Sequence, residues 1–316
     1  MGRWPAPAIL LLVALASPGS SWAQTRTDEP TSRAAEKRGQ PFWLALARDC
    51  AVPPGETAYG LVGEAVSLLG SPEMVWRDDV GYGVVAACVY QQRRLPPEER
   101  RELVARLSAN LRRGLGEQGT DSVLLRSFSA LDLSVLAAVE IVDPALDEAG
   151  YRQLLDDALG YLRDERDLRG LDTRVGWIHA IAHTADLLKF LARDARFTRA
   201  DQARLLDAAW SKLTAGGTPV LTHAEDERLA AALAAVARRA DFDPVSLGPW
   251  LARFPALEKQ VWEKAPPDPA RLAASQNARN LLRSFYVLLS LPEPAPTPGQ
   301  AAARDGVLTT LQQIRR

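Results

Sequence analysis

The sequence predicts an all-α fold of stacked antiparallel helical pairs, either a HEAT-like α-solenoid or an α/α superhelix. From Pro41 onward, apolar residues recur at intervals of three and four, and no stretch alternates convincingly like a β-strand. The breaks are short and carry Pro, Gly or Asp, which favours antiparallel neighbours. The predicted helices span residues 42–51, 57–70, 80–94, 98–114, 121–142, 148–164, 174–194, 199–214, 223–240, 245–264, 268–291 and 301–314.

A short internal repeat supports the stacking. The sequence Leu-Leu-Arg-Ser-Phe occurs at Leu124–Phe128 and again 157 residues later at Leu281–Phe285, each time inside an apolar helix. This separation is close to four units of about 40 residues, the period of HEAT-like repeats. A chance match in a chain rich in Leu and Arg is the alternative.

The first residues have the features of a secretion signal peptide, which we predict over residues 1–23. Arg3 precedes an apolar stretch from Ala8 to Ala16, and small residues precede the expected cleavage near Ala23. We therefore expect an exported, soluble protein in the periplasm. The apolar stretch is too short to span a bilayer, and no later stretch approaches about 18 apolar residues, so we expect no transmembrane segment in the mature chain.

Composition divides the rest of the chain. Residues 24–40 are polar and are expected to form a flexible tether. Residues 41–291 form the predicted helical repeat domain. Residues 292–316 are expected to contain a proline-rich linker and a C-terminal helix.

Charge and motifs exclude several classes of function. The formal net charge is −1, and acids and bases are intermixed, so no basic surface for nucleic acid is present. Gly114–Gly119 matches a dinucleotide-binding fingerprint by letter, but a predicted helix precedes it where that fold requires a strand. We interpret this segment as a helix-ending loop. No Gly-x-Ser-x-Gly elbow, phosphate loop or Cys-x-x-Cys pair occurs.

Cys50 and Cys88 are the two cysteines. Export would allow a disulfide that closes a loop of about 40 residues and adds roughly 4 kcal/mol of stability. Cys88 also lies in an apolar run, where a free thiol acts as a small hydrophobic side chain. Spacing does not distinguish the two interpretations.

The segment from Gly176 to Asp186 is the strongest candidate for a site. His179, His183 and Asp186 are spaced i, i+4 and i+7, so one helix would present them as a single polar stripe, with Trp177 beside it. Two imidazoles one turn apart can bind a divalent metal that a carboxylate completes. His223 is the obvious further ligand.

The same stripe has other interpretations. The segment His179–His183 lacks the glutamate base of the metalloprotease pattern, since Ala180, Ile181 and Ala182 lie between the two histidines. His183 and Asp186 can form a hydrogen-bonded pair that closes a helix contact, and the stripe continues into charged residues typical of a solvent-facing margin. A metal site, a metal-free ligand site and a structural network all remain open.

Thr222–Arg228 is a second polar concentration. The spacing predicts a capping box, with Thr222 as N-cap and Glu225 as its partner. In a functional interpretation, Glu225 or Asp226 would act with His223 opposite the other histidines.

Charged residues near apolar helices complete the candidates. Asp79 is predicted to cap a helix that begins at Val80. Arg126 and Arg283 lie in apolar helices and would need carboxylate partners if buried. The candidate partners are Asp78, Asp186 and Asp226.

Several of these segments together resemble a bacterial family, domain of unknown function 2785. The resemblance is carried, in order, by Arg77-Asp78, Arg126-Ser127-Phe128-Ser129, Gly176-Trp177-x-His179-Ala180-x-Ala182-His183-x-x-Asp186 and Glu225-Asp226-Glu227-Arg228-Leu229. It covers residues 60 to 240, with the histidine segment as its most specific part. The resemblance implies an all-helical protein and supplies no reaction or catalytic residue.

These observations predict an exported helical binding or scaffold module with a polar groove around His179, His183 and Asp186. Its ligand would be a protein, a peptide or an envelope-derived molecule. The alternative is a metal-dependent hydrolase that uses the same residues with a divalent metal. In a third, purely structural interpretation, these side chains form a buried network that fixes the helical stack.

Overall fold

The computed structural model describes residues 37–291 and 295–314. Its N-terminal part contains α2 (Gln40–Asp49), α3 (Ala58–Val66), η1 (Val75–Tyr82), α4 (Gly83–Val85), η2 (Ala86–Gln91) and α5 (Pro97–Asn110). The middle contains α6 (Ser122–Glu140), α7 (Glu148–Asp164), strands β1 (Leu171–Asp172) and β2 (Gly176–Trp177), α8 (Ala180–Leu191), α9 (Arg199–Thr214) and α10 (Glu225–Ala237). The C-terminal part contains η3 (Pro244–Leu247), α11 (Gly248–Leu251), α12 (Arg253–Val261), α13 (Pro269–Ser290) and α14 (Pro298–Gln313).

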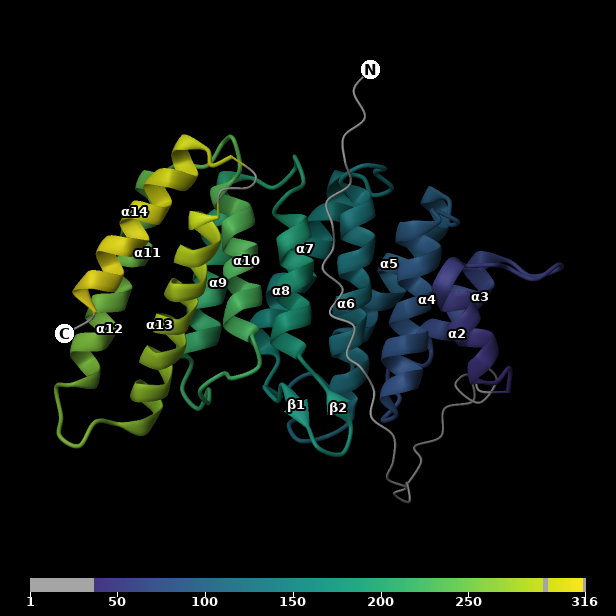
Figure 1. Cartoon of the computed structure of the whole chain (residues 1–316), viewed down its shortest axis with the longest axis horizontal. Coiled ribbons are helices and arrows are strands. Elements are labelled where there is room, and N and C mark those ends of the chain that lie inside the picture. The colour runs from purple at the N-terminus through teal and green to yellow at the C-terminus, as the bar shows by residue number, and fades with distance from the viewer. Residues whose placement is uncertain (1–36, 292–294, 315–316) are drawn as a thin grey trace.

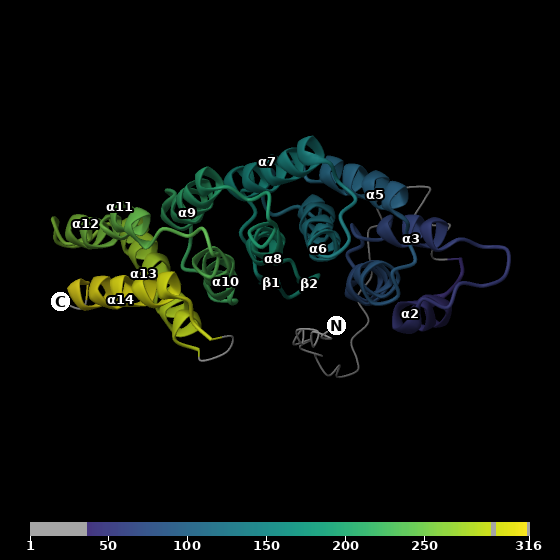
Figure 2. The same cartoon turned by 90° about the horizontal axis from the view of Figure 1, so that it is seen from above.

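The all-α prediction is confirmed. The helices run roughly side by side along the molecule (Figure 1) and form two layers that follow an arc (Figure 2). Helices α3, α5, α7 and α9 lie on the convex side, whereas α6, α8 and α10 lie on the concave side. Helix α6 packs against α8, α8 against α10, and α10 against α13, so the inner layer forms a continuous core. The predicted signal peptide and most of the predicted tether lie outside the described residues, as does the start of the proline-rich linker.

The sequence prediction differs from the structure where helices begin. The helix expected from residue 80 starts at Val75, and its first eight residues are π-helical, so Asp79 lies inside the helix and is not its N-cap. The helix expected from 174 starts at Ala180, because Gly176 and Trp177 pair antiparallel with Asp172 and Leu171. Strands of two residues are too short to show an alternating pattern.

Arg126 has a different partner from those expected. It is fully buried, and its Nε and Nη2 bind the two carboxylate oxygens of Glu165 at 2.7 and 3.2 Å. Glu165 directly follows α7, and helix packing brings it to α6, so Asp78, Asp186 and Asp226 are not the partner. Arg283 is exposed and needs no buried partner. The two Leu-Leu-Arg-Ser-Phe segments therefore lie in different surroundings.

Cys50 and Cys88 form a disulfide that joins the end of α2 to η2, with a Cα–Cα distance of 5.1 Å. Both cysteines are fully buried. The bridge is thus part of the core at the N-terminal end of the arc, and the interpretation of Cys88 as a free thiol is wrong.

Within the described residues, α6 is long and apolar enough to cross a membrane, a feature that the sequence analysis missed. However, 78% of its most apolar window is buried inside the protein. Its apolar character belongs to a core helix, because α6 lies between α5 and α8.

We expect the Cys50→Ser/Cys88→Ser double variant to unfold more easily at the N-terminal end of the arc. The bridge closes a loop across 38 positions, and its loss should lower stability there by up to about 4 kcal/mol. Hydrogen exchange should show faster exchange of the α2 amides. Equal protection of α2 in the parent and the variant would contradict a stabilising role.

We expect Arg126→Met to lower the free energy of unfolding by about 3–5 kcal/mol, because Glu165 would stay buried without its cation. Urea denaturation measures this change. The Arg126→Met/Glu165→Gln variant should be more stable than the single variant, since no buried charge remains. A double variant that is less stable than Arg126→Met would argue against this account.

Candidate functional site

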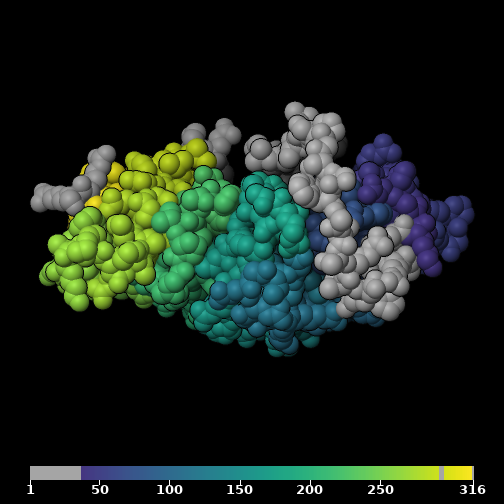
Figure 3. Space-filling view, turned by 90° about the horizontal axis from the view of Figure 1, so that it is seen from below, coloured from purple at the N-terminus to yellow at the C-terminus, as the bar shows by residue number. Residues whose placement is uncertain are grey.

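Three inner helices, α6, α8 and α10, begin at the same edge of the arc, where the β1–β2 hairpin lies (Figure 1). Figure 3 shows the molecule from this edge, with the middle of the chain in teal and green at the centre. The segment Trp177–His179 precedes α8, and His223 precedes α10. The ring centroids of Trp177 and His223 lie 5.8 Å apart, so aromatic side chains from two loops meet at this edge.

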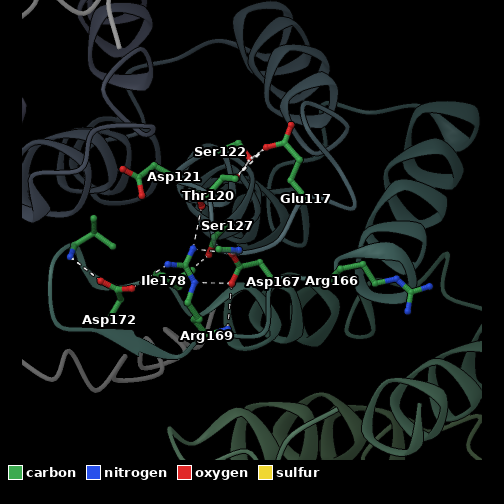
Figure 4. Close-up of polar contacts among 12 residues, drawn as sticks. Glu117, Thr120, Asp121, Ser122, Ser127, Arg166, Asp167, Arg169, Asp172 and Ile178 are labelled. Atoms are coloured by element: carbon green, nitrogen blue, oxygen red, sulfur yellow. Dashed lines mark hydrogen bonds and ion pairs between the residues drawn. The ribbon is translucent and has the colours of Figure 1, made fainter. Parts of the chain in front are cut away.

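A dense polar network holds the loop between α7 and α8 (Figure 4). The Glu165 carboxylate accepts the backbone N–H groups of Arg166 and Asp167 as well as the Arg126 guanidinium. Buried Asp167 accepts from Gly119 N and from Arg169, which also donates to Asp172 and to the carbonyl of Thr120. Charged side chains thus anchor both ends of this loop.

Arg77 fixes the hairpin from the opposite side. Its side chain is fully buried and donates to the carbonyl oxygens of Val175 and Trp177, and to those of Ser71 and Pro72. Because no carboxylate binds it directly, burial lowers the pKa of Arg77 to about 10. The guanidinium stays charged at neutral pH and holds the backbone beside the aromatic edge.

Gly170 allows close contact between the loop that joins α7 to α8 and the loop that joins α9 to α10. Its carbonyl accepts the N–H groups of Ile178 and His179, at 2.9 and 3.3 Å. A Cβ atom at this position would lie 2.6 Å from the Cβ of His223 and 2.6 Å from a carboxylate oxygen of Glu225. A glycine is required here because the backbone of one loop contacts the side chains of the other.

His179 does not belong to the helical stripe that the sequence predicted. It is the N-cap of α8, with a φ of 52° in the left-handed region, and its side chain makes no capping hydrogen bond. Its ring stacks on Trp177 with a centroid distance of 4.3 Å. Left-handed backbone at a residue other than glycine is uncommon and often accompanies a functional site.

The His179 imidazole is neutral at pH 7. Burial, followed by the positive charge of Arg228, lowers its pKa to about 4. Its Nε2 is buried with no hydrogen-bond partner among the described residues, so in the neutral tautomer that carries its hydrogen on Nδ1 this nitrogen is a free acceptor.

His183 is part of the core. Its Nδ1 lies 2.8 Å from the Oγ of Ser127, whose hydroxyl donates to the carbonyl of Ile178. Since the single hydroxyl hydrogen is used there, His183 must donate to Ser127 and cannot activate it as a nucleophile. The pKa of His183 lies well below 6.5 because the ring is buried.

Asp186 also serves the helix packing. It makes ion pairs with Lys189, at 2.7 Å, and with Arg228 of α10. The predicted pair with His183 is absent, and Lys189 belongs to this network. No set of three His, Cys, Asp or Glu residues in the described ranges is placed to hold a metal ion. Of the three residues expected to bind a metal, Asp186 is therefore already paired with two cations, and His183 uses its Nδ1 to bind Ser127.

The start of α10 differs from the predicted capping box. The N-cap is Ala224, with a φ of 65°, and Thr222 lies outside the helix. The buried carboxylate of Glu225 accepts the backbone N–H of His223 at 2.8 Å and so fixes this loop. Asp226 accepts from Ser284 of α13 and connects helices instead of joining the histidines.

Acidic groups that the sequence analysis did not connect lie beside this region. Asp132 of α6 is fully buried, and neither carboxylate oxygen has a hydrogen-bond partner among the described residues. Burial raises its pKa well above 3.8, and the nearby Asp78 raises it further. Burial also raises the pKa of Asp78 to about 6 and that of Tyr82 to about 12. The sequence contained one indication of this buried acid, because Asp132 is an acidic residue inside the long apolar segment 121–142.

A family model described as "Protein of unknown function (DUF2785)" matches residues 111–287. The chain belongs to this family. The match to domain of unknown function 2785 extends from the loop after α5 into α13 and includes Trp177, His179 and His223. Arg77 and Asp78 lie outside it. Comparisons with curated proteins and with solved structures found no match.

We expect the low pKa of His179 to make the fold sensitive to acid. Its folded-state pKa is below the unfolded value of 6.5, so the unfolded chain takes up protons first and stability is lost as the pH falls from about 6.5 towards 4. The loss should be on the order of 2 kcal/mol, allowing for the partial exposure of the ring.

Chemical denaturation of the parent and a His179→Gln variant at pH 7 and pH 4.5 measures this contribution. Comparing the two proteins removes the opposite contribution of Asp78 and Asp132, whose raised pKa values favour the folded state at low pH. The stability advantage of the parent should shrink at pH 4.5. Parallel curves would show that His179 does not titrate in this range.

Proposed function

We propose that this protein is an exported binding module whose ligand contacts Trp177, His179 and His223. The observation that carries the proposal is the buried, unpartnered Nε2 of His179. A buried acceptor without a donor costs roughly 1–3 kcal/mol, and a ligand that supplies an O–H or N–H group removes this cost. The networks around Glu165, Arg77 and Gly170 hold the acceptor in place before the ligand binds, which lowers the entropic cost of binding.

The surroundings indicate the chemistry of the ligand. The half-buried indole of Trp177 offers a flat apolar surface, and the neutral imidazole of His179 offers hydrogen bonds without charge. Helix α8 begins at this edge without a side-chain cap and without an acid in its first turn, so its first N–H groups favour a carboxylate. Sugar rings, amides and carboxylates occur together in peptidoglycan fragments, and we propose this class of envelope-derived ligand.

The disulfide supports export, since such bonds persist in oxidising compartments. The packing of α5 against α6, α7 against α8 and α9 against α10 across the two layers supports a HEAT-like stack. The alternative, a metal-dependent hydrolase that uses His179, His183 and Asp186, has less support. Asp186 is paired with two cations, and no three His, Cys, Asp or Glu residues in the described ranges are placed to hold a metal ion.

Isothermal titration calorimetry of the mature protein with a soluble disaccharide-tetrapeptide tests the proposal. We expect binding by the parent and about tenfold weaker binding by His179→Phe, because one hydrogen bond to a buried acceptor is lost. Trp177→Ala should weaken binding similarly by removing the stacking surface.

Trp262→Ala is the matched control, because this tryptophan is 59% exposed and lies in the C-terminal part of the chain. It should bind like the parent, and thermal unfolding should show that all variants are folded. Absence of binding by the parent, or equal weakening by Trp262→Ala, would refute the proposed site.

A further inference from the structure

A groove lies between α5 and α7. These two helices belong to the outer layer, on the convex side of the arc (Figure 2). This groove has a volume of about 630 Å³. The side chains of Val104, Leu146 and Leu154 give it apolar walls, and Ala105 and Ala109 widen it on the α5 side. None of the residues that line it belongs to the aromatic edge around Trp177.

Two arginines mark the ends of the groove, Arg101 in α5 and Arg112 just after α5 ends at Asn110. Arg101 donates to the carbonyl of Ala145, just before α7, and Arg112 binds Asp157 of α7. The two helices therefore run in the same direction and are linked at both ends, while small side chains between these links leave the space open. The groove follows from this spacing of large and small residues along α5.

Ser108 contributes an unpartnered polar atom to the groove. The residue is 9% exposed, and its Oγ has no hydrogen-bond partner among the described residues. A buried hydroxyl in this state is unfavourable by roughly 1–3 kcal/mol. A ligand with a hydroxyl or carbonyl at this position would satisfy it.

One end of the groove carries a cation with unused donors. Asp157 is paired with Arg112, and Asp147 caps α7 by accepting from Gly150 while keeping its charge. Arg101 is exposed and donates to a carbonyl, and no carboxylate among the described residues pairs with it. It retains N–H donors that can bind a carboxylate in a bidentate manner.

Spacing connects the two polar positions. Arg101 and Ser108 are seven residues apart on α5, so they share one face of the helix and are separated by about 10 Å along its axis. The volume suits a small molecule, since such sites measure about 300–1,000 Å³. A three-turn partner helix about 10 Å across would need on the order of 1,200 Å³.

We propose that this groove binds a medium-chain fatty acid that carries an oxygen near its far end. The carboxylate would bind Arg101, the chain would lie on Val104, Ala105 and Leu154, and the terminal oxygen would reach Ser108. The site is separate from the aromatic edge and does not depend on the function proposed for that edge.

Calorimetry with ω-hydroxydecanoate and decanoate tests this site in the mature protein. The parent should bind the hydroxylated acid about tenfold more tightly, because only this ligand satisfies Ser108. In Ser108→Ala this preference should disappear. Arg101→Gln should weaken both ligands at least tenfold by removing the charge that binds the carboxylate.

Filling the groove provides an independent test. Ala105→Phe and Ala109→Phe place a ring in the space for the chain and should abolish binding of both acids, whereas Ala203→Phe, at an exposed position of α9, should leave it unchanged. Thermal unfolding confirms that the variants are folded. Absence of binding by the parent, or unchanged binding in both groove-filling variants, would overturn the proposal, as would an equal preference in Ser108→Ala and the parent.

Discussion

The buried ion pair between Arg126 and Glu165 is the interaction on which the aromatic edge depends. A cation and a carboxylate are expensive to bury, and the cost is offset here by bidentate geometry and by two backbone N–H groups that bind the same carboxylate. Lys212 of α9 adds a further bond to the carbonyl of Glu165. Three helices thus converge on one residue at the start of the loop that carries Trp177. Buried interactions in the core therefore determine the position of that loop.

The histidines and their neighbours fall into two groups, according to whether the fold already uses their polar atoms. Nδ1 of His183 and the Asp186 carboxylate are engaged within the fold, whereas Trp177, His179 and His223 are half-buried at the edge and include Nε2 of His179, which has no partner among the described residues. The structural and functional interpretations of the predicted stripe therefore apply to different residues. This division explains how one short segment can fix the packing of α6 against α8 and also carry the edge at which we propose that a ligand binds.

Helical periodicity predicted most of the fold. The helices at 148–164 and 199–214 have the predicted bounds, because Asp147 and Thr198 are ordinary side-chain caps beside regular apolar patterns. The predicted start of α8 was wrong because the hairpin and the left-handed backbone of His179 are fixed by Arg77 and Gly170. Arg77 is distant in sequence, and Gly170 acts through its backbone carbonyl. Spacing also identified Trp177, His179 and His223, but no local pattern could show that Glu165 would meet Arg126 or that Asp132 would lack a partner.

Gly170 limits how this edge can change over evolution or in the laboratory. Even a methyl group there would collide with His223 and Glu225, while its carbonyl must still accept two N–H groups from the far end of the same loop. The backbone of this loop is therefore held in one position. New ligand preferences can arise through exchange of the rings at positions 177 and 223, whereas insertions or substitutions at the glycine would separate the two loops and remove the surface that they share.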